Sequence, residues 1–294
     1  CRREDTSMSN TNYQQEYQAA LSAPEAFWQQ QAAKLSWYKA PHNILQQQDA
    51  DHYQWFSDGV LNTAYLALDY QIEQGRGEQT ALIYDSPVSN TKQRFSYRQL
   101  RDEVAQFAGV LKALGVAKGD RVVIYMPMIP QAAIAMLAVA RLGAVHSVVF
   151  GGFSAHELAL RIDDASPKVV VSASCGIEIS KIIAYKPLLD DAINKAQHKP
   201  EHCVIYQRPQ LLATLQSGRE NSVDEEVMNF FTLVRLLIKT KMQETPKTQD
   251  LKKLLFRIES ITPQMLAIIR RTVIFNWYWE QTIELLAAHN LHPN

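Results

Sequence analysis

The spacing of apolar residues changes twice along the chain, which divides it into three stretches. Between residues 79 and 206, short β-branched runs alternate with segments whose apolar residues recur every three or four positions. This alternation is typical of βαβ units, because crossover helices bury both faces of a parallel sheet. The middle stretch is therefore predicted to be a doubly wound α/β region with a mostly parallel sheet. Its strands are expected at TALIY (80–84), RVVIYMP (121–127), VHSVVF (145–150), KVVVSAS (168–174) and HCVIY (202–206).

Four segments between these strands have helical spacing. The first lies within 95–116 and ends at Gly115, and the second is almost wholly apolar and ends at Gly143. Glycine after the last periodic residue is a common way for a helix to end. The other two helices are expected in SAHELALRIDDA and AYKPLLDDAINKAQ. The strand VHSVVF follows the apolar helix and is expected to be buried on both faces.

The stretches on either side have different patterns. Residues 11–70 are rich in glutamine and aromatic residues, which we interpret as a structural cover. PEAFWQQQAAKL is predicted to be a helix that begins near Pro24, and PHNILQQQDADHYQWF is predicted to be extended chain. After Gly218 the chain has no further glycine, and its apolar residues have helical spacing. The predicted domains are thus an amino-terminal cover (10–70), a partial α/β domain (71–220) and an unrelated all-helical tail (221–294).

Charge and composition narrow the classes of partner. The chain has 30 Lys and Arg against 30 Asp and Glu. We therefore expect neither a nucleic acid nor a membrane surface as its main partner. The 3 cysteines share no C-x-x-C spacing, which favours reduced thiols and a cytoplasmic protein. The apolar runs of the tail are short or interrupted by arginine, as at Arg235 and Arg270, so no membrane span is expected. Because the first methionine is Met8, residues 1–7 are expected to be upstream translation or a fragment edge, with no signal peptide after them.

Two adjacent glycines, Gly151 and Gly152, follow the strand VHSVVF directly. Adjacent glycines indicate either a positive φ or the close approach of another group to the backbone. Ligands of open α/β sheets bind beyond the carboxyl ends of the strands. Ser154 and Glu157 have the spacing of a capping box, and the N–H groups of a helix start favour an anion. Two interpretations stay open: a tight strand-to-helix turn, or a place where a linear ligand or a phosphate passes the backbone.

A long stretch of the chain resembles the amino-terminal half of the short-chain acyl-CoA synthetases, and most of all their propionate-CoA ligase branch. It runs from FSYRQLRDEVAQFAGVLKALG through VHSVVFGGFSAHELALRIDD to GIEISKIIAYKPLLDDAI. The aromatic segment 12–65 resembles the amino-terminal cover of the same family, so the likeness spans about residues 10–215. The resemblance implies two steps. A small carboxylate, propionate or acetate, attacks ATP bound with Mg²⁺ to give an acyl-adenylate and pyrophosphate, and the thiol of coenzyme A then displaces AMP.

The resemblance also assigns cofactor contacts. It places the pantetheine arm of coenzyme A against Gly151 and Gly152. It places the phosphates of coenzyme A at the loop formed by Glu178, Ile179, Ser180 and Lys181. Propionate-type members usually have GIEPGR at this loop. Lys181 therefore keeps a positive charge but loses the planar, bidentate geometry of an arginine.

The glycine-rich triphosphate loop of the family, similar to YTSGTTGKPKG, has no counterpart in the sequence, and neither has its catalytic lysine. Preorganised charge stabilisation is usually the largest catalytic contribution, so we expect a fragment that is inactive alone. Two alternatives stay open: a non-catalytic module that binds coenzyme A or a nucleotide, and an interaction protein whose tail docks on a full-length ligase. No catalytic residue or metal ligand is predicted, since His198, His202 and Cys203 lack a second ligand pair at zinc spacing.

Overall fold

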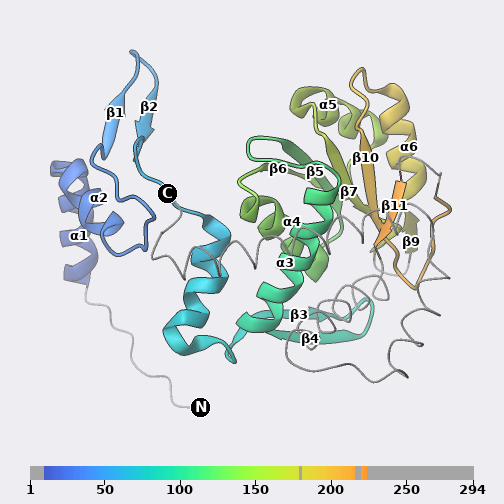
Figure 1. The fold of residues 1–294 in the computed structure, drawn as a ribbon, viewed down its shortest axis with the longest axis horizontal. Helices are drawn as coiled ribbons and strands as arrows, with labels where there is room; N and C mark the ends of the chain where they lie inside the picture. Colours follow the sequence, from blue (N-terminus) through green and yellow to red (C-terminus); the bar gives the residue numbers. More distant parts are fainter. Residues whose placement is uncertain (1–9, 179–180, 216–219, 224–294) are drawn as a thin grey trace, which may run out of the picture. The chain divides into compact units, whose positions relative to one another are not determined.

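The computed structural model describes residues 10–178, 181–215 and 220–223, and the chain divides into two compact units between Gln74 and Gly75 (Figure 1). In the first unit, helix α2 begins with Pro24 at its first turn, as predicted. The segment expected to be extended chain instead forms an antiparallel hairpin, in which Gln46 lies opposite Gln54. The elements of this unit are α1 (Asn10–Ser22), α2 (Pro24–Ala32), β1 (Leu45–Gln47), β2 (Tyr53–Trp55) and the π-helical turn η1 (Tyr65–Asp69), and a second such turn, η2 (Ile72–Arg76), spans the division.

Five parallel strands form the central sheet of the second unit, in the order β11-β10-β7-β5-β6 (Figure 1). Four of these strands coincide with the runs predicted at 121–127, 145–150, 168–174 and 202–206. The fifth strand, β11, lies at the opposite end of the sheet from β6 and follows the last predicted run in the sequence. The strands are β5 (Arg121–Met126), β6 (Val145–Phe150), β7 (Val169–Ala173), β10 (His202–Tyr206) and β11 (Glu220–Val223).

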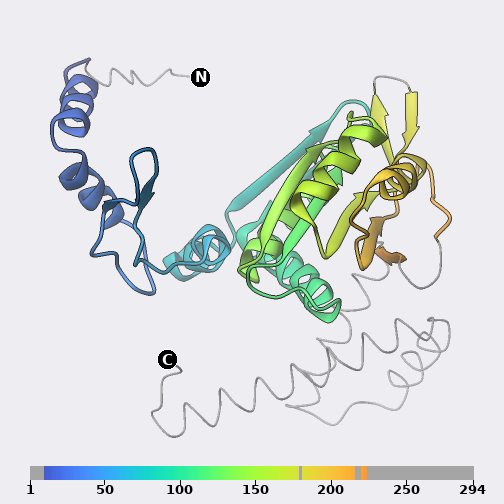
Figure 2. The same cartoon turned by 90° about the horizontal axis from the view of Figure 1, so that it is seen from above.

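Helices cover both faces of this sheet (Figure 2). Helix α3 packs on α4, and α5 packs on α6. Under α5 and α6, alternate strand residues such as Val123, Val149 and Val170 form one buried cluster. Gly115 and Gly143 follow α3 and α4 with φ of +85° and +69°, as expected of glycines that end helices. The helices are α3 (Tyr97–Ala113), α4 (Pro130–Arg141), α5 (Ala155–Ala165) and α6 (Tyr185–Lys195).

The predicted α/β fold with a parallel sheet is thus confirmed. The all-helical tail predicted for 221–294 lies outside the described residues, apart from residues 221–223, which belong to β11. In the described part of the chain, no helix combines the length and the apolar character that crossing a membrane requires.

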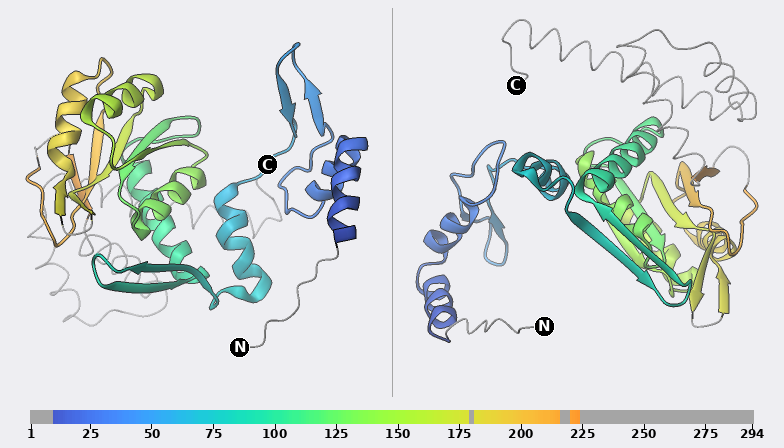
Figure 3. Two further views of the ribbon diagram at one scale, coloured as in Figure 1. Left: turned by 180° about the vertical axis from the view of Figure 1, so that it is seen from behind. Right: turned by 90° about the horizontal axis from the view of Figure 1, so that it is seen from below.

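The strand predicted at 80–84 exists, but its expected place in the parallel sheet is wrong. Strand β3 (Thr80–Ser86) pairs antiparallel with β4 (Thr91–Ser96) in a sheet of its own, next to α3 (Figure 3). The short connection between these strands explains the difference. A parallel partner needs a crossover of about a dozen residues or more, whereas a short loop closes an antiparallel hairpin.

The expectation that VHSVVF is buried on both faces is also wrong. Among the strands that the structure describes, β6 lies at one end of the sheet and pairs with β5. The side chains of Val145, Val148 and Phe150 are 54%, 54% and 67% exposed, whereas Val149 is buried. A continuous apolar run predicts a strand but does not fix its place in the sheet, so the run alone could not identify an edge strand.

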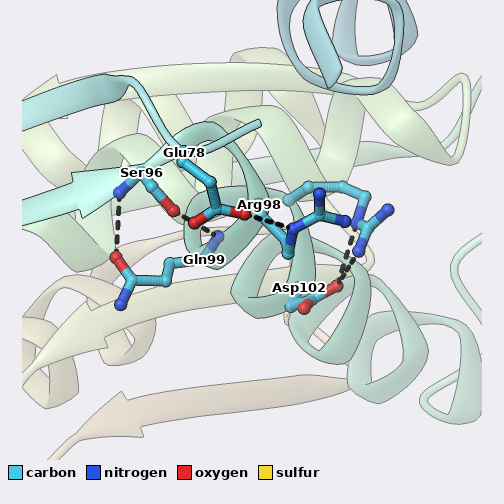
Figure 4. A network of polar contacts seen from close by, with 6 residues as sticks. Glu78, Ser96, Arg98, Gln99 and Asp102 are labelled. Atoms are coloured by element: carbon cyan, nitrogen blue, oxygen red, sulfur yellow. Dashed lines mark hydrogen bonds and ion pairs between the residues drawn. The ribbon is translucent and has the colours of Figure 1, made fainter. Parts of the chain in front are cut away.

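Helix α3 begins with a capping box (Figure 4). The backbone N–H of Gln99 donates to Oγ of Ser96 at 3.2 Å, and the backbone N–H of Ser96 donates to Oε1 of Gln99 at 2.9 Å. In the same turn, Nε of Arg98 donates to Glu78 at 2.8 Å. The two contacts of the capping box satisfy backbone N–H groups at the helix start, and so they fix where α3 begins.

Candidate functional site

The carboxyl ends of the parallel strands bring the two predicted cofactor segments to one edge of the sheet. The turn with Gly151 and Gly152 follows β6. The other segment follows β7 and forms a hairpin of β8 (Cys175–Glu178) and β9 (Lys181–Ala184), in which Glu178 lies opposite Lys181. The predicted loop is therefore the end of a hairpin. This edge is the usual ligand-binding edge of an open α/β sheet.

The structure gives the reason for one of the two adjacent glycines. Neither has a positive φ, so the requirement is for space. A β-carbon added at Gly151 would overlap the hydroxyl of Tyr185 and would lie 3.0 Å from two of its ring carbons. At Gly152 it would lie 2.5 Å from Cε1 of Phe150, which is the far end of an exposed side chain. Gly151 is buried and makes room for a protein side chain, whereas Gly152 is exposed at the surface.

Two stacked tyrosines pack against this turn from inside the protein. The ring centroids of Tyr125 and Tyr185 are 5.0 Å apart, with 27° between the ring planes. The Tyr125 hydroxyl lies 3.2 Å from the carbonyl oxygen of Gly151 and 3.0 Å from that of Phe153, to which it donates. Burial raises the pKa of Tyr125 to about 12. The hydroxyl is a protonated donor at neutral pH, and its raised pKa keeps it protonated further into alkali than an ordinary tyrosine.

Tyr185 also contacts the hairpin. A β-carbon added at Gly176 would lie 2.6 Å from the hydroxyl oxygen of Tyr185. Burial raises the pKa of Tyr185, the negative charge of Glu178 raises it further, and the positive charge of Arg208 opposes this rise. The ring therefore fits between Gly151 and Gly176, so that it links the turn after β6 to the hairpin after β7.

Arg208 fixes the start of the hairpin. Its side chain is 6% exposed, and its Nη1 donates to the carbonyl oxygen of Cys175 at 3.0 Å. Its backbone N–H donates to Oγ of Ser174 at 2.8 Å. The backbone N–H of Tyr185 donates to the carbonyl oxygen of Ser174 at 3.0 Å. Both ends of the hairpin are thus tied to the residue that follows β7.

Helix α5 begins directly after the glycine turn. The backbone N–H of Glu157 donates to Oγ of Ser154 at 3.3 Å, which is the Ser154 half of the predicted capping box. Ser154 is exposed, and the helix start lies next to the exposed Gly152. The partial positive charge of a helix N-terminus favours an anion here.

The two segments that carry the predicted cofactor residues meet at the ring of Tyr185, which lies against Gly151 and Gly176. Glu178 and Lys181 are exposed at the end of the hairpin, and Ile179 and Ser180 lie outside the described residues. The contacts of these residues, and of both glycines, with coenzyme A stay predictions. His198 is occupied structurally, since its Nε2 lies 2.8 Å from the carbonyl oxygen of Pro167. The described residues contain no cluster of three potential metal-ligating side chains.

Sequence reasoning did not find Tyr125, Tyr185 or Arg208. Tyr125 continues an apolar strand pattern and Tyr185 begins a helix, so their spacing does not indicate that they meet. The one available signal was glycine itself. A glycine at a strand end implies a close neighbour or an unusual φ, but it does not say which residue is the neighbour.

Comparison with models of protein families identifies the family of the chain. Residues 68–256 match the model of the AMP-binding enzyme family, and residues 13–67 match that of the acetyl-coenzyme A synthetase N-terminus. The chain belongs to the AMP-binding enzyme family. The first match runs to residue 256, farther than the resemblance expected from the sequence.

Relatives of this AMP-binding chain confirm its resemblance to short-chain acyl-CoA synthetases. An uncharacterized protein of Pseudomonas aeruginosa is 62% identical over 208 residues, which cover 71% of this chain and 33% of that protein. Human mitochondrial acyl-CoA synthetase short-chain family member 3 is 47% identical, with 76% of this chain and 32% of that protein covered. The propionate–CoA ligase of Escherichia coli is 45% identical, with 69% and 32% covered. The chain thus spans about a third of the length of these relatives.

A solved structure supports the fold of the AMP-binding chain. Acetoacetyl-CoA synthetase from Streptomyces lividans is similar with a TM-score of 0.62 and 24% sequence identity. The similarity covers 72% of this chain and 32% of that structure. At this level of identity, the similarity concerns the fold alone.

Proposed function

We propose that the chain carries the coenzyme A-binding edge of a short-chain acyl-CoA synthetase, which joins a small carboxylate to coenzyme A at the expense of ATP with Mg²⁺. The observation that supports this proposal is the exposed backbone of Gly152 next to the start of α5. The relatives supply the class of reaction, since two are named as acyl-CoA synthetase and propionate–CoA ligase. Propionate or acetate is the proposed class of acid.

The residues at this edge have separate tasks in the proposal. The thin pantetheine arm of coenzyme A passes Gly152, where no β-carbon blocks the backbone. The N–H groups at the start of α5 and the ammonium group of Lys181 favour the phosphates of coenzyme A. A lysine acts there as a point charge without bidentate geometry, so we expect Lys181 to add affinity but little orientation.

We further propose that this chain does not adenylate a carboxylate by itself. It contains no Gly/Ser/Thr-rich run with which backbone donors could hold a triphosphate. The chain is also proposed to act in the cytoplasm. Cys175 and Cys203, both buried and without a disulfide in the described part of the chain, are consistent with that proposal.

Titration calorimetry of the full chain with coenzyme A tests the proposed site. We expect saturable binding, which Gly152→Ala weakens by about tenfold, or about 1.4 kcal/mol, because the new methyl group occupies the path of the ligand. Gly109→Ala is the matched control. A β-carbon at Gly109, inside α3, has no neighbour within 4 Å, so this variant is expected to bind coenzyme A as the unaltered chain does.

Two results would contradict the proposal. One is a folded chain that shows no binding of coenzyme A. The other is an equal loss of affinity in the Gly109→Ala control, since that loss could not come from the glycine turn.

A further inference from the structure

The fit of Tyr185 against Gly151 is the first of two observations at the glycine turn. A methyl group at Gly151 would overlap the Tyr185 hydroxyl and crowd Cε2 and Cζ of the ring, both at 3.0 Å. The ring is buried and is also confined by Gly176 and by the stacked ring of Tyr125. It therefore cannot move aside as an exposed side chain could. The absence of a β-carbon at Gly151 makes room for the ring of Tyr185. Gly152 is then the glycine whose exposed backbone a ligand can approach.

The second observation is the hydroxyl of Tyr125. It binds two carbonyl oxygens of one short turn, those of Gly151 and Phe153. The turn itself is closed by the N–H of Phe153, which donates to the carbonyl oxygen of Phe150 at 3.0 Å. One side chain of the neighbouring strand thus restrains the backbone on both sides of Gly152. Such a restraint fixes the position of Gly152 before any ligand arrives.

We propose that Tyr125 and Tyr185 are positioning residues for the turn Gly151–Phe153, which they hold in the shape that admits a thin ligand arm at Gly152. The proposal rests on the proposed coenzyme A site. Tyr125 acts through its hydroxyl, and Tyr185 acts through the fit of its ring between Gly151 and Gly176. Neither tyrosine touches the ligand in this assignment.

The sheet provides a matched control for Tyr125. Ser172, on the adjacent strand β7, is buried, and its Oγ donates to the backbone carbonyl oxygen of Tyr125 at 2.8 Å. Ser172→Ala removes a buried hydroxyl from the same pair of strands without removing a contact to the turn. Tyr125→Phe removes the hydroxyl that holds the turn and keeps the stacked ring.

Amide hydrogen exchange of the full chain tests the restraint directly. In Tyr125→Phe, we expect the amides of residues 151–154 to exchange about fivefold faster, as for the loss of one ordinary hydrogen bond. In Ser172→Ala, exchange in these residues should remain as in the unaltered chain. Unchanged exchange in Tyr125→Phe, or the same increase in both variants, would overturn the role of the hydroxyl.

A double-mutant cycle tests the fit of Tyr185. Gly151→Ala is expected to lower the midpoint of thermal unfolding strongly in the unaltered chain, and less in the background of Tyr185→Leu, where the ring is absent. Gly152→Ala is the comparison, and its effect should be the same in both backgrounds. Equal effects of Gly151→Ala in both backgrounds would overturn the role of Tyr185. If Gly151→Ala alone is too unstable to fold, the double variant with Tyr185→Leu decides. If the double variant folds, the steric fit between Tyr185 and Gly151 is supported. If it does not fold, the result counts against that fit.

Coenzyme A affinity then separates positioning from general stability. Tyr125→Phe should raise the dissociation constant about fivefold, and Ser172→Ala should leave it unchanged at a similar loss of stability. Equal changes in both variants would mean that the hydroxyl acts only through stability. If the unaltered chain does not bind coenzyme A, the proposed function fails, while the exchange and the double-mutant cycle still decide whether the tyrosines hold the turn.

Discussion

Tyr125 combines full burial with a satisfied hydroxyl. Its side chain is 0% exposed, and its hydroxyl nevertheless has two carbonyl acceptors, so burial leaves no donor without a partner. A phenolate in the same place would face two carbonyl oxygens and the ring of Tyr185 in place of water. The charged form is therefore disfavoured, and the pKa rises to about 12 for this reason.

This shift predicts how stability changes in alkali. The pKa of Tyr125 is about 12 in the folded chain and 10.0 ordinarily, so the unfolded chain releases the proton first as the pH rises. The stabilising contribution is complete below about pH 10 and is lost between about pH 10 and 12. Tyr125→Phe should be less stable at neutral pH, and its free energy of unfolding should fall less steeply across that window.

Urea unfolding at a series of pH values measures this difference. Tyr185 also has a raised pKa, so some alkaline loss remains in the variant. If the free energy of unfolding falls equally steeply with pH in Tyr125→Phe and in the unaltered chain, the buried hydroxyl does not titrate as described.

At the scale of elements, helix α6 has an end held by a side chain from the following loop. The ammonium group of Lys199 donates to three carbonyl oxygens, those of Ile193, Asn194 and Ala196, at 2.5, 3.1 and 2.6 Å. The carbonyls of Ile193 and Asn194 belong to the last turn, and Ala196 is the residue that follows it, where a helix leaves acceptors without partners and carries a partial negative charge. A cation placed there stabilises the helix by both effects.

Lys199→Met is expected to lower the free energy of unfolding by about 1–2 kcal/mol, because it removes charged hydrogen bonds from the helix end. Chemical denaturation of the full chain measures the loss. Lys195→Met is the matched control, since Lys195 pairs with the exposed carboxylate of Asp191 one turn away. An exposed pair of this kind contributes less than about 0.5 kcal/mol. Equal losses in the two variants would contradict the role of Lys199.

Local patterns predicted the elements better than their arrangement. Apolar spacing and helix-ending glycines correctly predicted α3 and α4, because these signals arise from residues close together in the chain. The place of β6 at the end of the sheet depends on the order of strands, which no single run of residues encodes. The parallel neighbour of β10 was missed for a related reason. ENSV (220–223) is a short polar run, and it becomes a strand by pairing with β10.

The candidate site also has one part that could be predicted from local signals and one part that could not. The adjacent glycines and the start of a helix could be predicted, since both are local signals. That Gly151 faces Tyr185 could not, because the two residues meet only through the packing of α6 beside the turn after β6. The resemblance to a known family supplied the ligand, and the structure supplied the reason for one of the two glycines.

At the scale of the whole molecule, the chain covers about a third of its relatives and is described as two units. The described part includes the proposed coenzyme A edge in the second unit. The alternative that the tail docks on a full-length ligase stays a prediction, as do the domain boundaries at 70 and 220. The family match to residue 256 shows that likeness to the AMP-binding enzymes continues past residue 220.

A test of the proposed lack of adenylation applies to the chain as a whole. With propionate or acetate, ATP, Mg²⁺ and labelled pyrophosphate, the purified chain should show no exchange of label into ATP above a sample without protein, since its sequence contains no Gly/Ser/Thr-rich run for a triphosphate. The propionate–CoA ligase of Escherichia coli serves as the active control. Exchange that rises in proportion to the amount of this chain would show that the triphosphate is held by groups other than a glycine-rich loop.

The contact between Tyr185 and Gly151 also restricts the order in which descendants of this sequence can change. While a tyrosine occupies position 185, alanine or any larger residue at position 151 meets a ring that has no room to withdraw. A smaller residue at 185 would remove this steric cost, so we expect loss of the glycine to follow loss of the tyrosine. Substitutions at these two positions therefore have a preferred order, in which the tyrosine is replaced first and the glycine afterwards.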